Sequence, residues 1–247
     1  MWVWYYDRQG VIQSNGIDFV KDLPRFLVLL LAFQRFELLD WGVITELNPG
    51  ATQAHKDEFD LPRGRVAQRF NAYYEQRQKE VPMCTLNKED FDSNSMGGLD
   101  LQDFKKIDID LKDWLSHKPH CLGGRATAVL GASDPRAQDK LACKISFPEA
   151  ARENEGKIID DLHRDIKGGK MPYLSKHLPE VQIYGDMSRY GTQRIRSLLK
   201  LSIEGYRTLR VLVSKELAPL TSVAGEGFVK AWLEVVRCTY IIILFRY

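Results

Sequence analysis

The stretch that decides the fold reads Leu141-Ala142-Cys143-Lys144-Ile145-Ser146-Phe147 and leads into a helical segment. Side chains alternate between the two faces of a strand, so Leu141, Cys143, Ile145 and Phe147 are expected on one face and Ala142 and Lys144 on the other. Lys144 then has two interpretations. It is either a solvated residue on an edge strand or a cation directed into a cleft, where it can meet phosphate.

The segment after this strand, residues 149–167, favours a helix that ends at Gly168-Gly169. Glu155 falls on its apolar stripe, which is formed by Ile158, Ile159, Leu162 and Ile166. A carboxylate on an apolar stripe costs free energy unless a cation meets it, so Lys144 is the expected partner. The alternative is a local pair with Arg152, worth only about 0.2–0.5 kcal/mol.

A glycine turn, Leu122-Gly123-Gly124-Arg125, precedes the expected strand that carries Val129. Backbone without side chains can approach phosphate oxygens closely and point N–H groups at them. Taken alone, a Gly-Gly pair between strands is more often an ordinary hairpin turn. Glycine turn, strand lysine and helix glutamate, in this order, resemble a protein-kinase small lobe, in which the lysine holds phosphates and the glutamate holds the lysine.

Composition excludes several other classes of protein. The 247 residues are 44% hydrophobic and 28% charged, with mean hydropathy −0.31, which excludes collagen-like, coiled-coil and wholly disordered chains. The net charge of +2 offers no basic excess to nucleic acid. No signal peptide and no apolar run of membrane-spanning length are visible, so no membrane partner is expected. The four cysteines form no C-x-x-C pair, the histidines show no metal-ligand spacing, and an intracellular (cytoplasmic or nuclear) protein without a metal site is predicted.

Over the whole chain, the sequence predicts a mixed α+β fold. Strands are expected at residues 2–6, 11–13, 107–111, 125–130, 141–147, 181–184 and 209–213. A short helix, a break at Pro24 and then a buried helix are expected between residues 18 and 39, a surface helix at 65–78, a flexible loop at 94–98 and another helix from Phe228. Four regions follow: 1–47, an accessory hairpin and buried helix; 48–106, polar and irregular; 107–217, a kinase-like small lobe; and 218–247, the start of a truncated large lobe.

The chain resembles the fungal-type protein kinase family, a divergent branch of the protein-kinase superfamily. The resemblance runs over almost the whole length. It is carried by Tyr6-Asp7-Arg8-Gln9-Gly10, Gly16-Ile17-Asp18-Phe19, Leu23-Pro24-Arg25-Phe26, Trp41-Gly42, Gly124-Arg125-Ala126-Thr127, Lys144-Ile145-Ser146-Phe147-Pro148-Glu149, Arg152 with Glu155, Leu178-Pro179-Glu180-Val181, Leu209-Arg210-Val211-Leu212-Val213 and Phe228-Val229-Lys230-Ala231-Trp232. The family usually has Gly-Arg-Gly-Thr at the nucleotide turn, and here Ala126 stands at the second glycine.

This resemblance implies ATP-dependent phosphorylation of protein Ser/Thr hydroxyls, with magnesium. Lys144 would bind the α- and β-phosphates and Glu155 would orient it. Residues 212–217 would be the hinge that contacts adenine. The residues it places around the nucleotide are Gly123, Gly124, Val129, Ala142, Lys144 and Val213.

The sequence departs from a complete kinase in its catalytic loop. A kinase needs H-R-D with an asparagine five residues later, and then D-F-G. No Asp-Phe-Gly occurs in the chain. His163-Arg164-Asp165 spells the loop but lies on the helix of Glu155, with Lys170 where the asparagine would be. We therefore expect a kinase small lobe that is inactive alone, with its large lobe essentially missing. The alternatives are a nucleotide-binding or partner-binding pseudokinase-like module, or a degenerate gene product.

Overall fold

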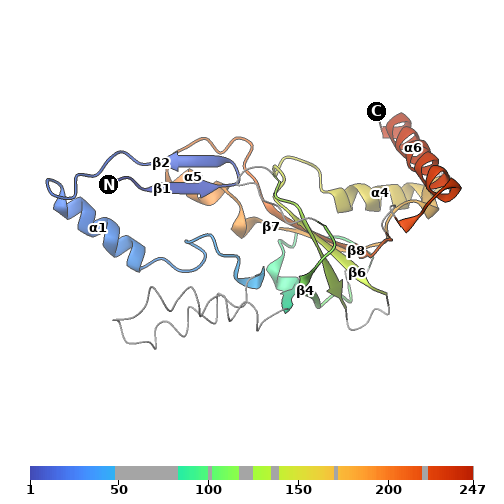
Figure 1. Ribbon diagram of the computed structural model, residues 1–247, viewed down its shortest axis with the longest axis horizontal. Helices are drawn as coiled ribbons and strands as arrows, with labels where there is room; N and C mark the ends of the chain where they lie inside the picture. Colours follow the sequence, from blue (N-terminus) through green and yellow to red (C-terminus); the bar gives the residue numbers. More distant parts are fainter. Residues whose placement is uncertain are drawn as a thin grey trace.

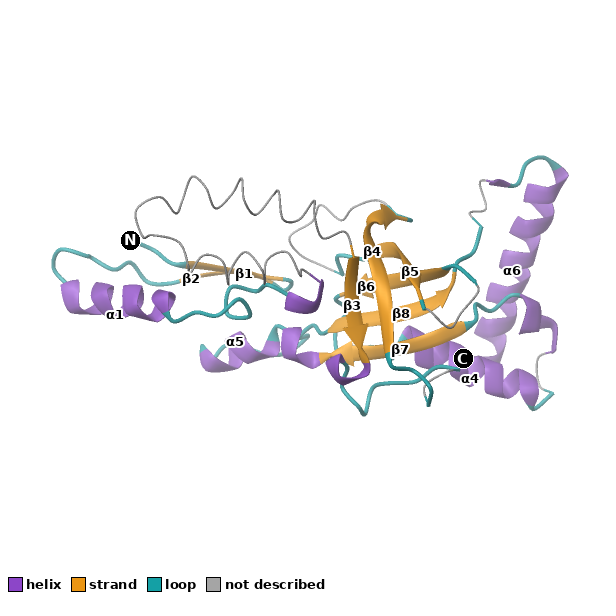
Figure 2. Ribbon diagram, turned by 90° about the horizontal axis from the view of Figure 1, so that it is seen from below, coloured by secondary structure: helices purple, strands orange, loops and turns teal. Residues whose placement is uncertain are grey.

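A six-stranded antiparallel sheet forms the centre of the computed structural model (Figures 1 and 2). The structure describes residues 1–47, 83–99, 102–116, 125–134, 139–169, 172–218 and 222–246. In the order in which they lie side by side, the strands are β3 (Met83–Asn87), β4 (Lys106–Trp114), β5 (Ala128–Ser133), β6 (Leu141–Ser146), β8 (Leu209–Lys215) and β7 (Val181–Met187).

The five strands expected between residues 107 and 213 are all present, with shifted ends. With one helix packed on the sheet, the architecture is α+β and compatible with a kinase-like small lobe. One face of the sheet carries the hydrophobic core, as the alternation in β6 predicts. Leu141 and Cys143 lie in it together with Ile107 and Ile109 of β4 and Val213 of β8.

Strand β3 is absent from the sequence-based expectation, which treats residues 48–106 as irregular. The structure places β3 at the edge of the sheet, where Cys84 and Leu86 are buried between more exposed neighbours. The expectation was wrong here because a strand of five residues in a polar context gives only a short alternation. The loop at residues 94–98 is also held in place, since Gly97 and Tyr184 exchange two backbone hydrogen bonds. The surface helix expected at residues 65–78 lies outside the described residues.

The N-terminal hairpin and helix extend away to one side of the six-stranded sheet (Figure 1, blue). Strands β1 (Trp4–Asp7) and β2 (Gly10–Gln13) pair as the expected hairpin. A single helix, α1 (Leu23–Gln34), replaces the two expected segments. Pro24 lies in its first turn, where the missing N–H costs nothing, so this proline starts the helix instead of breaking it. None of the residues of α1, all of which the structure describes, is buried, so the expected burial was wrong.

Helix α4 (Glu155–Lys167) packs on the sheet face opposite the main core, against β7 and β8 (Figure 2). It begins later than expected because Asn154 caps it, and it ends at Gly168 as predicted. A short helix, α5 (Gln193–Leu198), and a long one, α6 (Glu226–Arg246), complete the described elements. Of the helices in the part of the chain that the structure describes, none has both the length and the apolar character to cross a bilayer.

Candidate functional site

Strand register brings three of the candidate residues to one face of the sheet. Lys144 of β6 pairs directly with Val129 of β5, and Ala142 pairs with Gly131. On the other side, Lys144 pairs with Leu212 of β8. Directly paired residues in an antiparallel sheet point to the same face. Val129, Ala142 and Lys144 therefore share the face on which α4 packs, and the core lies behind them.

The ion pair between Lys144 and Glu155 is present. Lys144 Nζ lies 2.5 Å from Glu155 Oε2. The alternative partner, Arg152, instead lies 3.9 Å from Glu149. The burial expected for Glu155 was wrong: it is the first residue of α4, and the two side chains are 33% and 54% exposed. Pairs this accessible contribute about 0.2–1 kcal/mol, so the pair orients the ammonium more than it stabilises the fold.

The start of α4 is fixed by a cap and by close packing. Asn154 Oδ1 accepts a hydrogen bond of 2.9 Å from the N–H of Gly156. Tyr184 of β7 lies against Gly156 so closely that a methyl group there would overlap the ring. Behind this contact, Ile159 of α4 packs with Tyr184 and Leu212. Leu212, expected at the adenine hinge, thus lies beneath α4.

The structure does not bring Val213 to this face. Val213 pairs with Cys143, and both are 0% exposed in the core on the opposite side of the sheet. Its neighbour Ser214 instead pairs with Ala142 and points the same way as Lys144. Gly123 and Gly124 lie outside the described residues.

Ala126, at the end of the glycine turn, has a φ of 42°. This is the left-handed region, in which an L side chain crowds the backbone and glycine does not. The conformation thus suits glycine better than the alanine that this chain carries.

A fungal protein kinase family model matches residues 1–218 of the chain. This chain belongs to the fungal protein kinase family. No curated protein and no solved structure matches it. The match spans the N-terminal hairpin, α1 and the six-stranded sheet, so all of these are part of what the chain shares with its family.

Asp113 and Gly131 lie beside Ala142 and were not among the residues expected from the sequence. A methyl group at position 131 would overlap the carboxylate of Asp113, so this carboxylate lies over the strand beside Ala142. A glycine within a strand signals such a close approach, and Gly131 could have been singled out on that basis.

The motif His163-Arg164-Asp165 lies on α4, as expected, and is not a catalytic loop. His163 Nε2 lies 3.1 Å from the carbonyl oxygen of Pro179, and Arg164 pairs with Asp161 on its own helix. Over the described ranges, no group of three His, Cys, Asp or Glu side chains is placed to share a metal ion.

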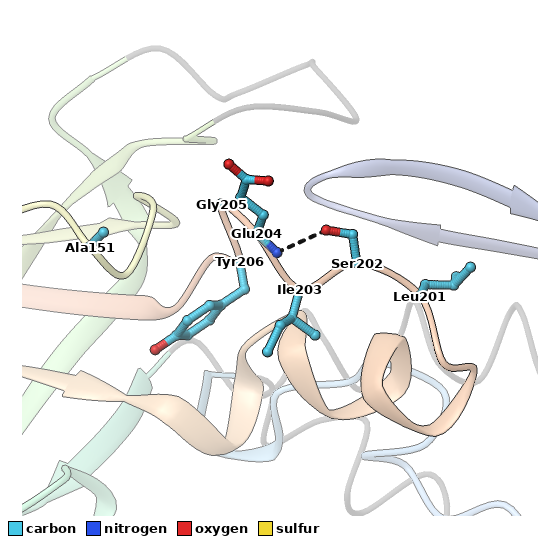
Figure 3. A pocket seen from close by; sticks show the side chains of 7 residues that line it. All are labelled: Ala151, Leu201, Ser202, Ile203, Glu204, Gly205 and Tyr206. Atoms are coloured by element: carbon cyan, nitrogen blue, oxygen red, sulfur yellow. Dashed lines mark hydrogen bonds between the residues drawn. The ribbon is translucent and has the colours of Figure 1, made fainter.

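An open hollow of about 600 Å³ lies at a separate place in the chain (Figure 3). It is lined by Ala151 and residues 201–206, and Ser202 Oγ accepts a hydrogen bond of 3.2 Å from the N–H of Glu204 at its rim. None of the candidate site residues lines it, so the hollow does not belong to the site around Lys144.

Proposed function

We propose that the sheet face carrying Lys144 binds ATP and that the chain acts as the nucleotide-binding part of a protein kinase. The observation that carries the proposal is the 2.5 Å contact between Lys144 Nζ and Glu155 Oε2. An ammonium has three N–H donors, so one can hold the carboxylate while the others reach phosphate oxygens. Lys144 is one third exposed, which leaves its head accessible to a ligand.

The residues around Lys144 suit a nucleotide. Val129 and Ala142 offer small apolar side chains on the same face, against which an adenine ring can lie. Ser214, beside Ala142 on β8, is our candidate for a polar contact to the base in place of Val213. We also propose that Gly123 and Gly124 cover the phosphates of the nucleotide. When bound, ATP supplies the γ-phosphoryl group that a kinase transfers to a Ser or Thr hydroxyl of a protein.

Phosphoryl transfer requires groups that we do not assign in this chain. The sequence contains no Asp-Phe-Gly, and Asp165 lies on α4. Positioning a nucleotide without an assigned base or magnesium ligands forfeits most of the electrostatic stabilisation of the transition state. We therefore propose that these 247 residues bind ATP but transfer phosphate slowly or not at all by themselves. Magnesium would accompany ATP, and its ligands are not assigned.

Calorimetric titration of the purified chain with ATP tests the proposal. We expect saturable binding that Lys144→Met weakens at least about tenfold, because the phosphates lose their cation. The matched control is Lys106→Met. Lys106 is also a strand lysine that pairs with a carboxylate, at 3.6 Å from Asp108, but it lies on β4. No saturable heat with the wild-type chain, or equal losses in the two variants, would overturn the proposal.

A second candidate, a partner-binding module, is favoured by the exposed apolar side chains of α6. They include Phe228, Val229, Trp232 and Leu233. Exposed patches of this kind mark interaction surfaces. The same titration separates the two functions, because a module that only binds a partner gives no saturable response to ATP.

A further inference from the structure

A buried ion pair joins the two last strands of the sheet beside the start of α4. Asp186 of β7 and Arg210 of β8 are direct cross-strand partners. Arg210 Nε and Nη2 donate to Asp186 Oδ1 and Oδ2 at 2.7 Å and 3.0 Å. The two side chains are only 9% and 18% exposed. Arg210 also pairs with Ser146 of β6, two residues after Lys144, so the ion pair lies on the same sheet face as Lys144.

The guanidinium of Arg210 donates hydrogen bonds to backbone carbonyl groups as well as to the carboxylate of Asp186. Its remaining nitrogen, Nη1, donates to the carbonyl oxygens of Arg152 and Glu153, both at 3.2 Å. These are the two residues before the helix cap, Asn154. Arg210 therefore fixes the backbone that leads into α4. Only a planar group with several donors can serve a carboxylate and two carbonyls at once.

Asp186 also contacts Asn154, the residue that caps α4. Asn154 Nδ2 lies 3.4 Å from Asp186 Oδ1, while Asn154 Oδ1 accepts from the N–H of Gly156. Three consecutive residues, 152 to 154, are thus tied to one ion pair on the sheet. The next residue is Glu155, and Lys144 lies on the strand beneath it.

We propose that Arg210 and Asp186 are positioning residues that fix the first turn of α4 and so hold Glu155 against Lys144. The geometric part stands on the contacts above, and its consequence for ATP rests on the proposed function. Replacing a buried ion pair by apolar residues is often neutral for stability, so this pair is better explained by the geometry it imposes than by the stability it adds.

The chain contains a matched control. Arg196 of α5 and Asp7 of β1 form another doubly hydrogen-bonded pair, with Nε and Nη2 at 2.8 Å and 2.9 Å from the carboxylate oxygens. Their side chains are 14% and 5% exposed. Arg196→Met therefore removes the same kind of interaction as Arg210→Met, but from the accessory hairpin and without any contact to α4.

Carbodiimide cross-linking of the full chain without nucleotide measures the position of Glu155 directly. The reagent joins a carboxylate to an amine only where the two are in contact, and both partners here are accessible. The cross-linked peptide is quantified by mass spectrometry. Lys215 and Asp139, 2.8 Å apart and 43% and 60% exposed, provide an internal standard in every sample.

We expect Arg210→Met to lower the Lys144–Glu155 cross-link about fivefold or more relative to this standard, because the first turn of α4 samples other positions. Arg196→Met should leave it unchanged. Arg210→Lys keeps the positive charge but not the planar guanidinium with its several N–H donors, so it should give an intermediate cross-link yield. A folded Arg210→Met chain with the wild-type yield would overturn the proposal.

A double variant decides the matter if Arg210→Met does not fold. Arg210→Met with Asp186→Leu leaves no unpaired buried charge and still removes the contacts to residues 152–154. A lost cross-link in this folded variant supports the proposal, and a wild-type yield contradicts it. ATP titration of the same proteins keeps the two proposals apart. If the wild-type chain binds no ATP, the proposed function fails, while the cross-link still reports whether Arg210 positions Glu155.

Discussion

Tyr184 of β7 packs directly against Gly156 of α4, and a methyl group at position 156 would overlap its ring. Glycine is needed here because the helix lies against the ring of Tyr184 one residue after Glu155 and leaves no room for a side chain. Because the helix starts so close to the sheet, the carboxylate of Glu155 reaches Lys144 on β6. The distance between helix and sheet at this point is therefore part of the candidate site.

Gly156→Ala should push the first turn of α4 away from the sheet. We expect the free energy of unfolding to fall by about 1–3 kcal/mol, as for other overpacked sites, and ATP binding to weaken. Urea denaturation and ATP titration measure the two effects. Gly168→Ala at the other end of α4 is the control, because a methyl group there meets nothing closer than 3.4 Å. Equal behaviour of the two variants would contradict the role of the close contact.

Val213→Ala tests whether the side chain of Val213 lies in the core, as in the structure, or contacts the nucleotide, as expected from the sequence. The side chain lies in the core at 0% exposure, so its truncation should cost about 1–3 kcal/mol of unfolding free energy. ATP affinity should stay within about twofold of the wild type, because Val213 points away from Lys144. Ser214→Val, on the nucleotide-facing side, should show the opposite pattern. A large affinity loss in Val213→Ala alone would restore the sequence-based assignment.

The contrast between Lys144 and Val213 shows how far the sequence can predict this site. In β6 the large apolar residues alternate with Ala142 and Lys144, so the position of Lys144 in this alternation is enough to place it on the face away from the core. In β8 the run Val211-Leu212-Val213 is apolar on both faces, because α4 covers one and the core fills the other. The polar residues Arg210 and Ser214 on either side of this run nevertheless share the face of Leu212, so the alternation alone would have put Val213 on the core side. Its assignment to the nucleotide failed because it came from the family resemblance and not from the strand pattern. The burial of Glu155 was overestimated for a different reason, since a residue in the first turn of a helix lies beyond the packed stripe.

The network around Arg210 was not predicted because it depends on pairing between strands. Arg210 and Asp186 are far apart in the sequence and meet only through the register of β7 and β8. The carbonyl groups that Arg210 holds carry no sequence signal at all. Spacing within one segment could therefore indicate the Lys144–Glu155 pair, but not the residues that position it.

Ala126→Gly should stabilise the protein. The φ of 42° costs an alanine free energy that glycine does not incur, so we expect a gain of about 0.5–1 kcal/mol in the free energy of unfolding. Ala128→Gly, two residues later in β5, is the control and should lose a similar amount, because glycine weakens a strand. Thermal and urea denaturation report both. A destabilised Ala126→Gly protein would show that the methyl group contributes more than the backbone strain removes.

Stability should decline in alkaline solution because burial raises the pKa of several acidic side chains, among them Cys84, Cys143 and Tyr184. Burial raises the pKa of the Cys84 thiol from 9.0 to about 12. Burial, with the nearby carboxylate of Asp160, raises the pKa of Tyr184 from 10.0 to about 12. These groups are neutral in the folded chain and ionise at lower pH when it unfolds, and the same holds for the buried Cys143 thiol. Their stabilising contribution is complete below about pH 9 and is lost as the pH rises from there towards 12.

Urea denaturation at a series of pH values between about 7 and 11 measures this decline. Tyr184→Phe should flatten the upper part of the curve, since it removes one of these ionisations and keeps the ring against Gly156. An unfolding free energy that is constant or rises above about pH 9 would contradict the prediction.

Asp113→Asn should strengthen ATP binding. The carboxylate of Asp113 lies over Gly131, which is paired with Ala142, so its negative charge would lie at the adenine end of the proposed nucleotide and repel the phosphates across the site. Removing this repulsion should raise the affinity about three- to tenfold at low ionic strength, and the gain should shrink when salt is added because exposed charges are screened. Glu89→Gln is the control, since it changes the net charge equally from an exposed position in the turn after β3. Equal gains in both variants would indicate a general charge effect and would remove Asp113 from the site. A loss of affinity in Asp113→Asn alone would assign the carboxylate a direct contact with the nucleotide instead of a repulsive one.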